Sequence, residues 1–388
     1  MERDASLFPE RKKRHRVFRG LTERQERSFN WIAGTVIVLL IAGWTGSIIE
    51  TRRRDAAEDR AAAGAERART GAPVSSPSPS SQIANAIVAP PAPRAAYMTD
   101  AMMAFLAPLR GASGQVKFTT RVPNAPIVKA PIGATAVLSQ GSTEVSSSFT
   151  APANPGIYDL AVKLNQTTQA VKGFSVITLV PFSQKQAGKI GLYYLGSWPF
   201  ERGGAPKTPA YANPSGFIQV TPQNADTYVS AHFKLRDFVT KDQPNVWPKY
   251  LLLNPKLLDK LELTIQELEA SGHPVKHMQV MSGFRTPNYN YKGGNIAGRA
   301  NLSRHMYGDA ADVFVDNDGN GAEDDLNHDG RVNPLDAQVV ADAADRVERK
   351  HPSLVGGIGV YSASSGHGPF THIDVRGYRA RWRGTGNG

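Results

Sequence analysis

The sequence predicts an α+β protein in which a C-terminal domain with an antiparallel sheet follows a small all-β domain and an N-terminal transmembrane helix. Three observations support this prediction: an uncharged run over 31–49, short β-prone runs between turn residues over 96–185, and a mixture of amphipathic helices and apolar strands over 186–388. A chain of 388 residues is too long for one ordinary core, so two folded units with additional segments are expected.

The run over 31–49 is a candidate membrane span. At about 1.5 Å per residue its length just crosses a hydrocarbon layer of about 30 Å, and Trp31 and Trp44 lie toward its ends. A buried core helix rarely runs so long without a polar face. A cleaved signal peptide fits poorly, because thirty residues precede the run and no small-residue cleavage site follows promptly. Nine Lys and Arg residues precede it, so 1–30 is expected to be a cytoplasmic tail and the rest to lie outside the cytoplasm.

The next two segments are a linker and a β domain. Residues 50–95 are rich in Ala, Pro and Ser and predict an extended tether. Runs of Val, Thr, Ile, Phe and Tyr between Pro, Gly and Asn over 96–185 predict an immunoglobulin-like β-sandwich. The net charge is +11, but residues 1–95 hold 16 Lys and Arg against 10 Asp and Glu, or +6 of that excess. No basic face with interleaved aromatics is evident in the remainder, so nucleic-acid binding is not expected.

The C-terminal region, 186–388, alternates helices and strands. Asn254-Pro255 caps an amphipathic helix that ends before Gly272, and Asn333-Pro334 caps a second one that reaches Val347. Short apolar runs over 278–281, 311–315, 358–361 and 371–375 predict strands, the last of these being the last strand of the core. Together they predict an antiparallel sheet with helices on it.

Two histidines and an aspartate in this region form a candidate metal site. His305 and Asp312 are separated by small residues, including Gly308 and Ala310, and His372 follows sixty residues after Asp312. Two imidazoles and a carboxylate close three corners of a tetrahedral zinc site and leave the fourth for water, whereas structural zinc sites usually take four protein ligands. The chain has no cysteine, so thiolate zinc sites are excluded.

The motifs around these residues resemble those of a known family. They are Ser282-Gly283-Phe284-Arg285-Thr286-Pro287, Ser303-x-His305-x-x-Gly308-x-Ala310-x-Asp312, Gly357-x-Gly359-x-Tyr361 and Thr371-His372-x-Asp374. Over roughly 215–385, the chain resembles the zinc D-alanyl-D-alanine metallopeptidases, which include vancomycin-resistance dipeptidases, phage endolysin peptidases and murein endopeptidases.

The resemblance implies a hedgehog/D-Ala-D-Ala-peptidase-like fold and zinc ligands at His305, Asp312 and His372. It also implies that Arg285 steadies the substrate near the scissile carbonyl and that Ser303 lines the site. Many family members place an acidic general base three residues before the last ligand, where this chain has Pro369. Asp374 and then His367 are the remaining candidates for the base, and Asp374 can equally orient a ligand imidazole.

A second metal site is predicted within 316–336. The spacing from residue 325 to residue 336 matches the twelve-residue calcium loop of EF-hand and dockerin type, with the glycine of the sharp turn at its sixth position, and a shorter copy of the pattern starts at residue 316. An acidic solvated loop is the alternative, although so many carboxylates repel one another without a cation. We expect a structural Ca²⁺ role for these side chains: Asp316, Asp318, Asn320, Asp324, Asp325, Asn327, Asp329, Asn333 and Asp336.

Taken together, these patterns predict a zinc peptidase that is anchored by one helix in a bacterial inner membrane, with its C-terminal domains in the periplasm. The expected substrates are peptidoglycan stem peptides or cross-links. The alternative is a metal-containing envelope module that binds without hydrolysis, as the hedgehog signalling domain does on a similar fold. An envelope scaffold built on the β domain leaves the motifs unexplained.

Overall fold

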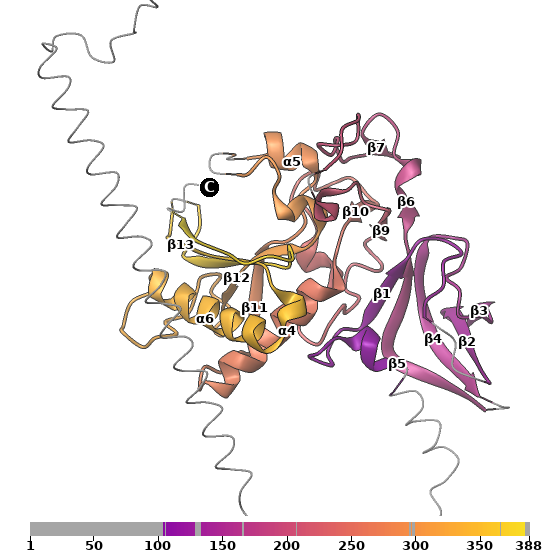
Figure 1. Ribbon diagram of the computed structural model, residues 1–388, viewed down its shortest axis with the longest axis horizontal. Coiled ribbons are helices and arrows are strands. Elements are labelled where there is room, and N and C mark those ends of the chain that lie inside the picture. Colours follow the sequence, from indigo (N-terminus) through magenta and orange to yellow (C-terminus); the bar gives the residue numbers. More distant parts are fainter. Residues whose placement is uncertain are drawn as a thin grey trace, which may run out of the picture. The chain divides into compact units, whose positions relative to one another are not determined.

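The computed structural model describes residues 104, 106–128, 133–164, 167–206, 208–294, 296, 299–364 and 366–384 (Figure 1). The predicted tail, transmembrane helix and linker, 1–30, 31–49 and 50–95, lie outside these residues. None of the helices in the described ranges is long and apolar enough to cross a membrane. The described residues belong to a single unit, 91–388, with mixed α+β structure and four sheets.

The first sheet has five strands in the order β1-β5-β4-β2-β3. Its members are β1 (Phe118–Arg121), β2 (Ala134–Gln140), β3 (Thr143–Ser146), β4 (Gly156–Leu164) and β5 (Thr167–Thr178). Every second residue of β4 from Tyr158 to Val162 is buried, so the sheet has one apolar face. The predicted sandwich is wrong for the described residues, because this face is covered by Leu106, Ile127 and Phe149 rather than by a second sheet of the same segment.

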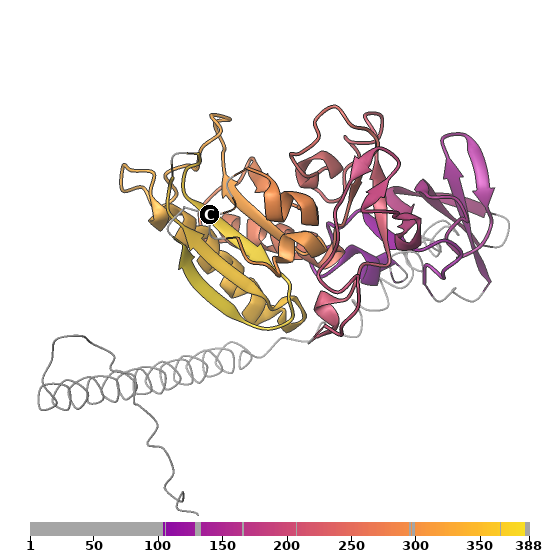
Figure 2. The same cartoon turned by 90° about the horizontal axis from the view of Figure 1, so that it is seen from above.

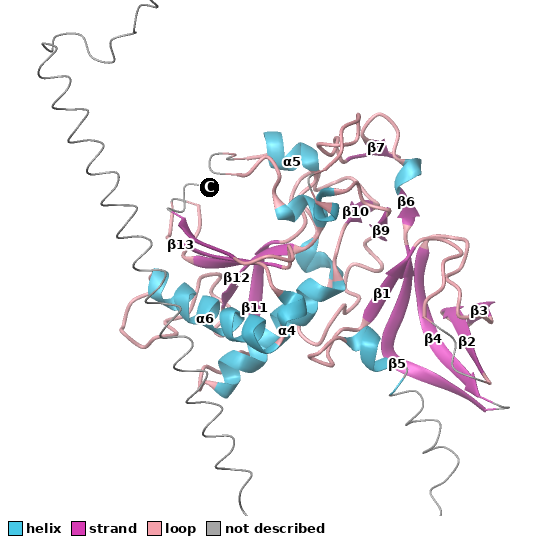
Figure 3. Ribbon diagram, in the orientation of Figure 1, coloured by secondary structure: helices cyan, strands magenta, loops and turns pink. Residues whose placement is uncertain are grey.

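Short strands and loops follow the first sheet, and most of the chain from 182 to 248 is loop (Figure 3). Strands β6 (Val180–Pro181), β9 (Gly216–Val220) and β10 (Lys249–Leu251) form a three-stranded sheet, and β7 (Lys189–Ile190) pairs with β8 (Tyr193–Tyr194). Three 3₁₀ turns lie among them: η1 (Phe182–Gln184), η2 (Pro209–Tyr211) and η3 (Leu235–Phe238). Phe217 and Trp198 from this region belong to the same hydrophobic core as the C-terminal strands and helices.

The C-terminal sheet has the strand order β11-β12-β14-β13-β15. Its strands are β11 (Met278–Ser282), β12 (Ala310–Val315), β13 (Gly357–Tyr361), β14 (Phe370–Asp374) and β15 (Ala380–Gly384). All neighbours are antiparallel except β13 and β15. The prediction that 371–375 is the last strand of the core is confirmed, because β14 is buried throughout whereas no residue of β15 is buried. The sequence did not predict β15, which extends the sheet and in which Arg381 pairs with acidic side chains of the neighbouring helix, Asp345 and Glu348.

Two long helices, α4 (Pro255–Ala270) and α6 (Pro334–Lys350), pack on each other and on β14. In both views they lie along the same side of the C-terminal sheet (Figures 1 and 2). Each begins at the predicted asparagine, since Asn254 and Asn333 accept hydrogen bonds from the backbone of the first turn. The shorter elements are α5 (Pro287–Lys292), η4 (Arg304–Tyr307) and η5 (Pro352–Leu354).

Candidate metal centre

The candidate metal centre lies on the C-terminal sheet, where strand register brings its residues into one row. Asp312 on β12 is directly opposite His372 on β14, which is opposite Gly359 on β13, which in turn is opposite Trp382 on β15. Directly paired positions of adjacent strands place their side chains on the same face of a sheet. Ile373 is buried in the hydrophobic core, and Thr371 donates a hydrogen bond to Ala337 O of α6, so His372 faces away from the helices.

His305 reaches this row from the turn η4, which several contacts hold in place. Its backbone carbonyl accepts a hydrogen bond from Arg285 N at 3.1 Å, and the next carbonyl, of Met306, accepts one from the Trp198 indole at 2.9 Å. Gly308 ends the turn with φ 68°, and a Cβ there would collide with the backbone of Leu252. Backbone packing therefore requires glycine at position 308.

The three side chains converge on one point. His305 Nε2 lies 3.2 Å from His372 Nδ1 and 3.2 Å from Asp312 Oδ1, and His372 Nδ1 lies 2.8 Å from the same Asp312 oxygen. Tetrahedral zinc holds its ligands at about 2.0–2.1 Å, which places ligand atoms about 3.3 Å from one another. The triangle therefore has nearly the edge length of a zinc tetrahedron, and the group can hold a metal ion.

The hydrogen bonds on the far side of each ring select the nitrogen that faces the centre. His305 Nδ1 lies 2.7 Å from Gly283 O, an acceptor, so it carries the proton and Nε2 presents a lone pair. His372 Nε2 lies 3.1 Å from Asp374 Oδ2 in the same manner, which directs Nδ1 toward Asp312. Metal-binding histidines are characteristically oriented by such carbonyl or carboxylate partners, so the residues present fit a metal.

Burial and charge set the protonation of the centre. Burial lowers the pKa of His305 to about 4, and the charge of Arg285 acts in the same direction. Burial also opposes protonation of His372, but hydrogen bonds to Asp312 and Asp374 outweigh it and raise its pKa above the usual value. The pKa of Asp312 lies well below its usual range, because the cost of burial is outweighed by the two imidazoles and Arg285. A neutral imidazole and a carboxylate are thus ready as ligands, and a metal would replace the proton of His372 Nδ1.

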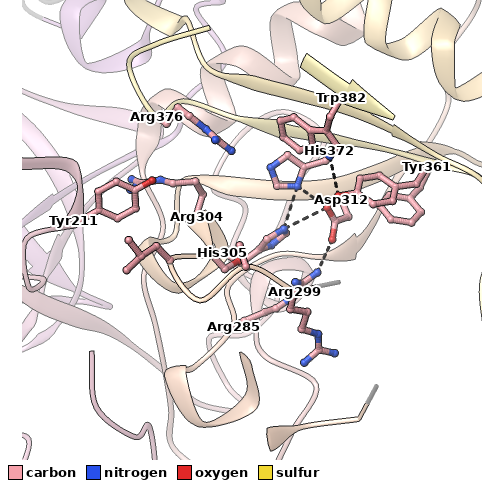
Figure 4. A pocket seen from close by; sticks show the side chains of 14 residues that line it. Tyr211, Arg285, Arg299, Arg304, His305, Asp312, Tyr361, His372, Arg376 and Trp382 are labelled. Carbon is pink, nitrogen blue, oxygen red and sulfur yellow. Dashed lines mark hydrogen bonds and ion pairs between the residues drawn. The ribbon is translucent and has the colours of Figure 1, made fainter. Parts of the chain in front are cut away.

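The centre opens into a cavity of about 480 Å³ (Figure 4). Of the predicted substrate-binding residues, Ser303 lines this cavity, and so does Arg285, whose Nη2 donates to Asp312 Oδ2 at 2.6 Å and whose Nε donates to Ser282 Oγ at 2.9 Å. Arg285 therefore fixes the carboxylate oxygen that the histidines leave free. The lining comprises Tyr211, Arg285, Arg299, Ala300, Leu302, Ser303, Arg304, His305, Asp312, Tyr361, Phe370, His372, Arg376 and Trp382.

Neither of the two candidates for the general base, Asp374 and His367, lines the cavity of the metal centre. Asp374 is fully buried behind His372, where it accepts hydrogen bonds from Gly357 N at 2.7 Å and Arg376 Nε at 2.9 Å. Burial acts against its ionisation, but His372 and Arg376 hold its pKa far below the usual range. His367 packs edge-on against Phe370 and lines a different cavity. Of the two roles predicted for Asp374, general base or orientation of a ligand imidazole, the geometry favours the orientation of His372.

Tyr361 and Trp382 are cavity residues to which the sequence analysis assigned no role. Trp382 Nε1 donates a hydrogen bond to Tyr361 Oη at 2.8 Å, and the Tyr361 ring stacks on Phe370 with centroids 4.5 Å apart. Because the oxygen already accepts this bond, the phenol proton is free to point at another acceptor. Tyr361 belongs to the Gly357-x-Gly359-x-Tyr361 motif. Trp382 lies on the edge strand β15, which the sequence did not predict.

The acidic segment forms two loops with the same hydrogen bonds. In the first, Asn320 N donates to Asp316 and Asp318, and Gly321 N donates to Asp316. The second, nine residues later, repeats this pattern with the groups Asp325, Asn327, Asp329 and Gly330. Asp336 closes the second loop by accepting from Asn327 N and Asn333 N. Carboxylate oxygens of Asp316, Asp318 and Asp324 lie within 4.8 Å of one another, an arrangement that can hold a cation.

Comparison with known proteins adds no assignment: no family model, no curated protein and no solved structure matches this chain.

Proposed function

We propose that the chain is a zinc-dependent peptidase that hydrolyses peptidoglycan stem peptides or cross-links, as a D,D-carboxypeptidase or endopeptidase. The observation that carries the proposal is the convergence of His305 Nε2, His372 Nδ1 and an Asp312 oxygen beside an open cavity. Three ligands with a free fourth position are typical of catalytic rather than structural zinc. The motifs shared with the zinc D-alanyl-D-alanine metallopeptidases supply the substrate class.

Hydrolysis adds the hydroxyl of a water to the carbonyl carbon and its proton to the amine that leaves. A zinc ion in this centre would supply a Lewis acid and lower the pKa of the attacking water toward about 7. The residues of the chain have three tasks. Arg285 holds Asp312 in position, and Asp374 holds His372. Tyr361 can donate a hydrogen bond to the carbonyl oxygen of the substrate as negative charge develops on it.

The location follows from the predicted membrane span. A helix over 31–49 with its basic tail in the cytoplasm would anchor the chain in a bacterial inner membrane and leave residues from 50 onward in the periplasm. Peptidoglycan lies in that compartment, and the tether over 50–95 would let the catalytic region reach it. We therefore propose a single-pass, membrane-anchored enzyme.

The two acidic loops are proposed to bind Ca²⁺ in a structural role. Each presents side-chain oxygens at the first, third and fifth positions and a glycine with positive φ at the sixth, Gly321 and Gly330. The loops connect β12, which carries Asp312, to α6, which supports the same sheet. A cation there would hold together carboxylates that otherwise repel one another.

A non-catalytic binding module is the second candidate. It is favoured by one observation: among the described residues, Asp312 is the only carboxylate that lines the cavity, and it is a candidate ligand. A peptidase of this kind needs a group to take a proton from water. Binding of a peptide by the metal and the surrounding arginines would need none.

Hydrolysis of muropeptides tests the proposal. The full-length protein in detergent, loaded with zinc, is expected to release new amine termini, and this release should stop with a zinc chelator and return when zinc is restored. His305→Ala should remain inactive in all three conditions. If the wild-type protein takes up zinc and binds muropeptides but produces no new amine, the binding module is the correct function.

A further inference from the structure

Four arginines line the cavity beside the metal centre, and three of them are already paired with a carboxylate. Arg285 pairs with Asp312, and the other two ion pairs, Arg304–Asp309 and Arg376–Asp374, also lie within the protein. The fourth, Arg299, has no carboxylate partner among the residues that the structure describes. Its charge is therefore available to a ligand in the cavity.

Arg299 is held in position although it is not neutralised. Its Nη1 donates to two backbone carbonyls, Tyr289 O at 2.8 Å and Gly293 O at 2.7 Å, and its guanidinium lies over the Tyr289 ring at 5.0 Å from the centroid. The Tyr289 side chain also hydrogen-bonds the guanidinium. Among the contacts of the described residues, two of the five N–H donors of Arg299 therefore remain for a ligand. A guanidinium with two unused donors matches the two oxygens of a carboxylate.

The surroundings of Arg299 favour an anion. Figure 4 shows Arg299 and Arg285 on the same side of the cavity, across Asp312 from His372. Burial lowers the pKa of Arg299, and the charge of Arg285 lowers it further, so the two guanidinium groups repel each other. Asp312 forms an ion pair with Arg285 and attracts Arg299 without pairing with it, so it offsets the two positive charges only in part. A negative group between the cavity wall and the metal centre would relieve the remaining repulsion.

We propose that Arg299 forms a carboxylate-binding subsite that selects peptides with a carboxylate close to the scissile bond. The inference rests on the proposed peptidase function and deepens it, because a free C-terminal carboxylate at this place means removal of a terminal residue rather than cleavage within a cross-link. A side-chain carboxylate of the stem peptide offers the same chemistry. Leu302 and Phe370, which line the same cavity, leave apolar wall for a small side chain.

Three peptides and three forms of the full-length, zinc-loaded protein test this subsite. The peptides are N-acetylated and end in D-alanyl-D-alanine as the free acid, in the same sequence as an amide, or in an amide whose last residue carries a glutamate carboxylate. The proteins are the wild type, Arg299→Gln, and Arg383→Gln as control, since Arg383 is exposed and donates to Gln338.

Arg299→Gln is expected to lower kcat/KM for the free acid by about 10- to 100-fold, mainly through KM, because a hydrogen bond to a charged group is lost. Cleavage of the plain amide should not change, and Arg383→Gln should match the wild type throughout. An effect of Arg299→Gln confined to the third peptide assigns the carboxylate to a side chain. Equal losses on acid and amide would overturn the subsite and leave Arg299 as a loop support.

Calorimetric binding of the free acid and the amide separates this inference from the proposed function. If the wild-type protein cleaves nothing but binds the acid more tightly than the amide, and Arg299→Gln removes that difference, the subsite stands and the peptidase proposal fails. If the wild-type protein cleaves the peptides but Arg299→Gln leaves its preference for the acid intact, the subsite fails and the peptidase stands. Equal binding of acid and amide by the wild type also overturns the subsite.

Discussion

The acidic loops over 316–336 follow Asp312 of the candidate metal centre within a few residues, yet the two sites are held in place in opposite ways. Asp312 and His372 stand on adjacent strands in direct register, and all three side chains of the centre are buried. The loop oxygens accept bonds mostly from backbone groups two to five residues away, and several, such as Asp318 and Asp329, are exposed. The first site therefore has its shape before a metal binds, whereas the proposed calcium site rests on local hydrogen bonds at the surface, where a cation would add more to stability.

The largest expected effect is the loss of zinc binding and hydrolysis when a ligand of the buried centre is removed. His305→Ala should abolish stoichiometric zinc binding and peptide hydrolysis while the protein keeps its fold, because the strands of the centre are held by backbone pairing. Metal content per chain and circular dichroism measure both. His277→Ala, at an exposed histidine, serves as the control and should retain zinc. Loss of the fold in the zinc-free wild type would show that the centre is not preformed.

Calcium is expected to change the free energy of unfolding, whereas zinc is expected to be needed for hydrolysis. At a Ca²⁺ concentration about 100 times the dissociation constant, binding stabilises the folded state by about 2.7 kcal/mol. Asp325→Asn removes the negative charge and one of the two oxygens at the first position of the second loop and should weaken this stabilisation, whereas Asp342→Asn, at an exposed carboxylate on α6, should not. Denaturant unfolding with and without Ca²⁺ measures it. An identical unfolding midpoint in both conditions rules out the loops as a calcium site.

The residues behind the metal ligands provide the next test. Asp374→Asn should weaken zinc binding by about 10- to 100-fold, because His372 loses the carboxylate that directs its Nδ1 toward Asp312. Asp309→Asn is the matched control, since Asp309 is also buried but pairs with Arg304 rather than with a candidate ligand. Competition with a fluorescent zinc chelator measures both variants. If both lose the same affinity, Asp374 acts on the fold and not on the ligand.

The same contrast explains what could be predicted from the sequence. The helix caps at Asn254 and Asn333 and the His–Asp–His set are local patterns with fixed spacing, and the structure contains both helices and brings the three side chains together. The fold of 104–178 was missed, because alternating burial defines one apolar face but does not say what covers it. The sequence could not single out Arg299 either. Arg299 differs from the other three arginines of the cavity only because each of those forms an ion pair with a carboxylate, and these pairs are visible only in the folded structure.

The smallest expected effect is a pH dependence of stability that comes from a pair of side chains outside both metal sites. His232 and Glu262, in contact with neither site, form a pair with Nδ1 2.7 Å from Oε2, and the hydrogen bond to Glu262 raises the pKa of His232. A raised pKa in the folded state means that the pair stabilises fully below the ordinary histidine value of about 6.5 and loses this contribution as pH rises through the folded-state value.

Because the His232 side chain is 36% exposed, the contribution should not exceed about 1 kcal/mol. The difference in unfolding free energy between the wild type and His232→Gln should therefore be largest near pH 6 and shrink toward pH 9, with His277→Gln as the exposed control. A difference that grows with pH would mean that Glu262 is not the partner that stabilises the charged imidazole. The change in stability on adding Ca²⁺ should be the same in His232→Gln and the wild type at each pH, since this pair and the loops share no residue.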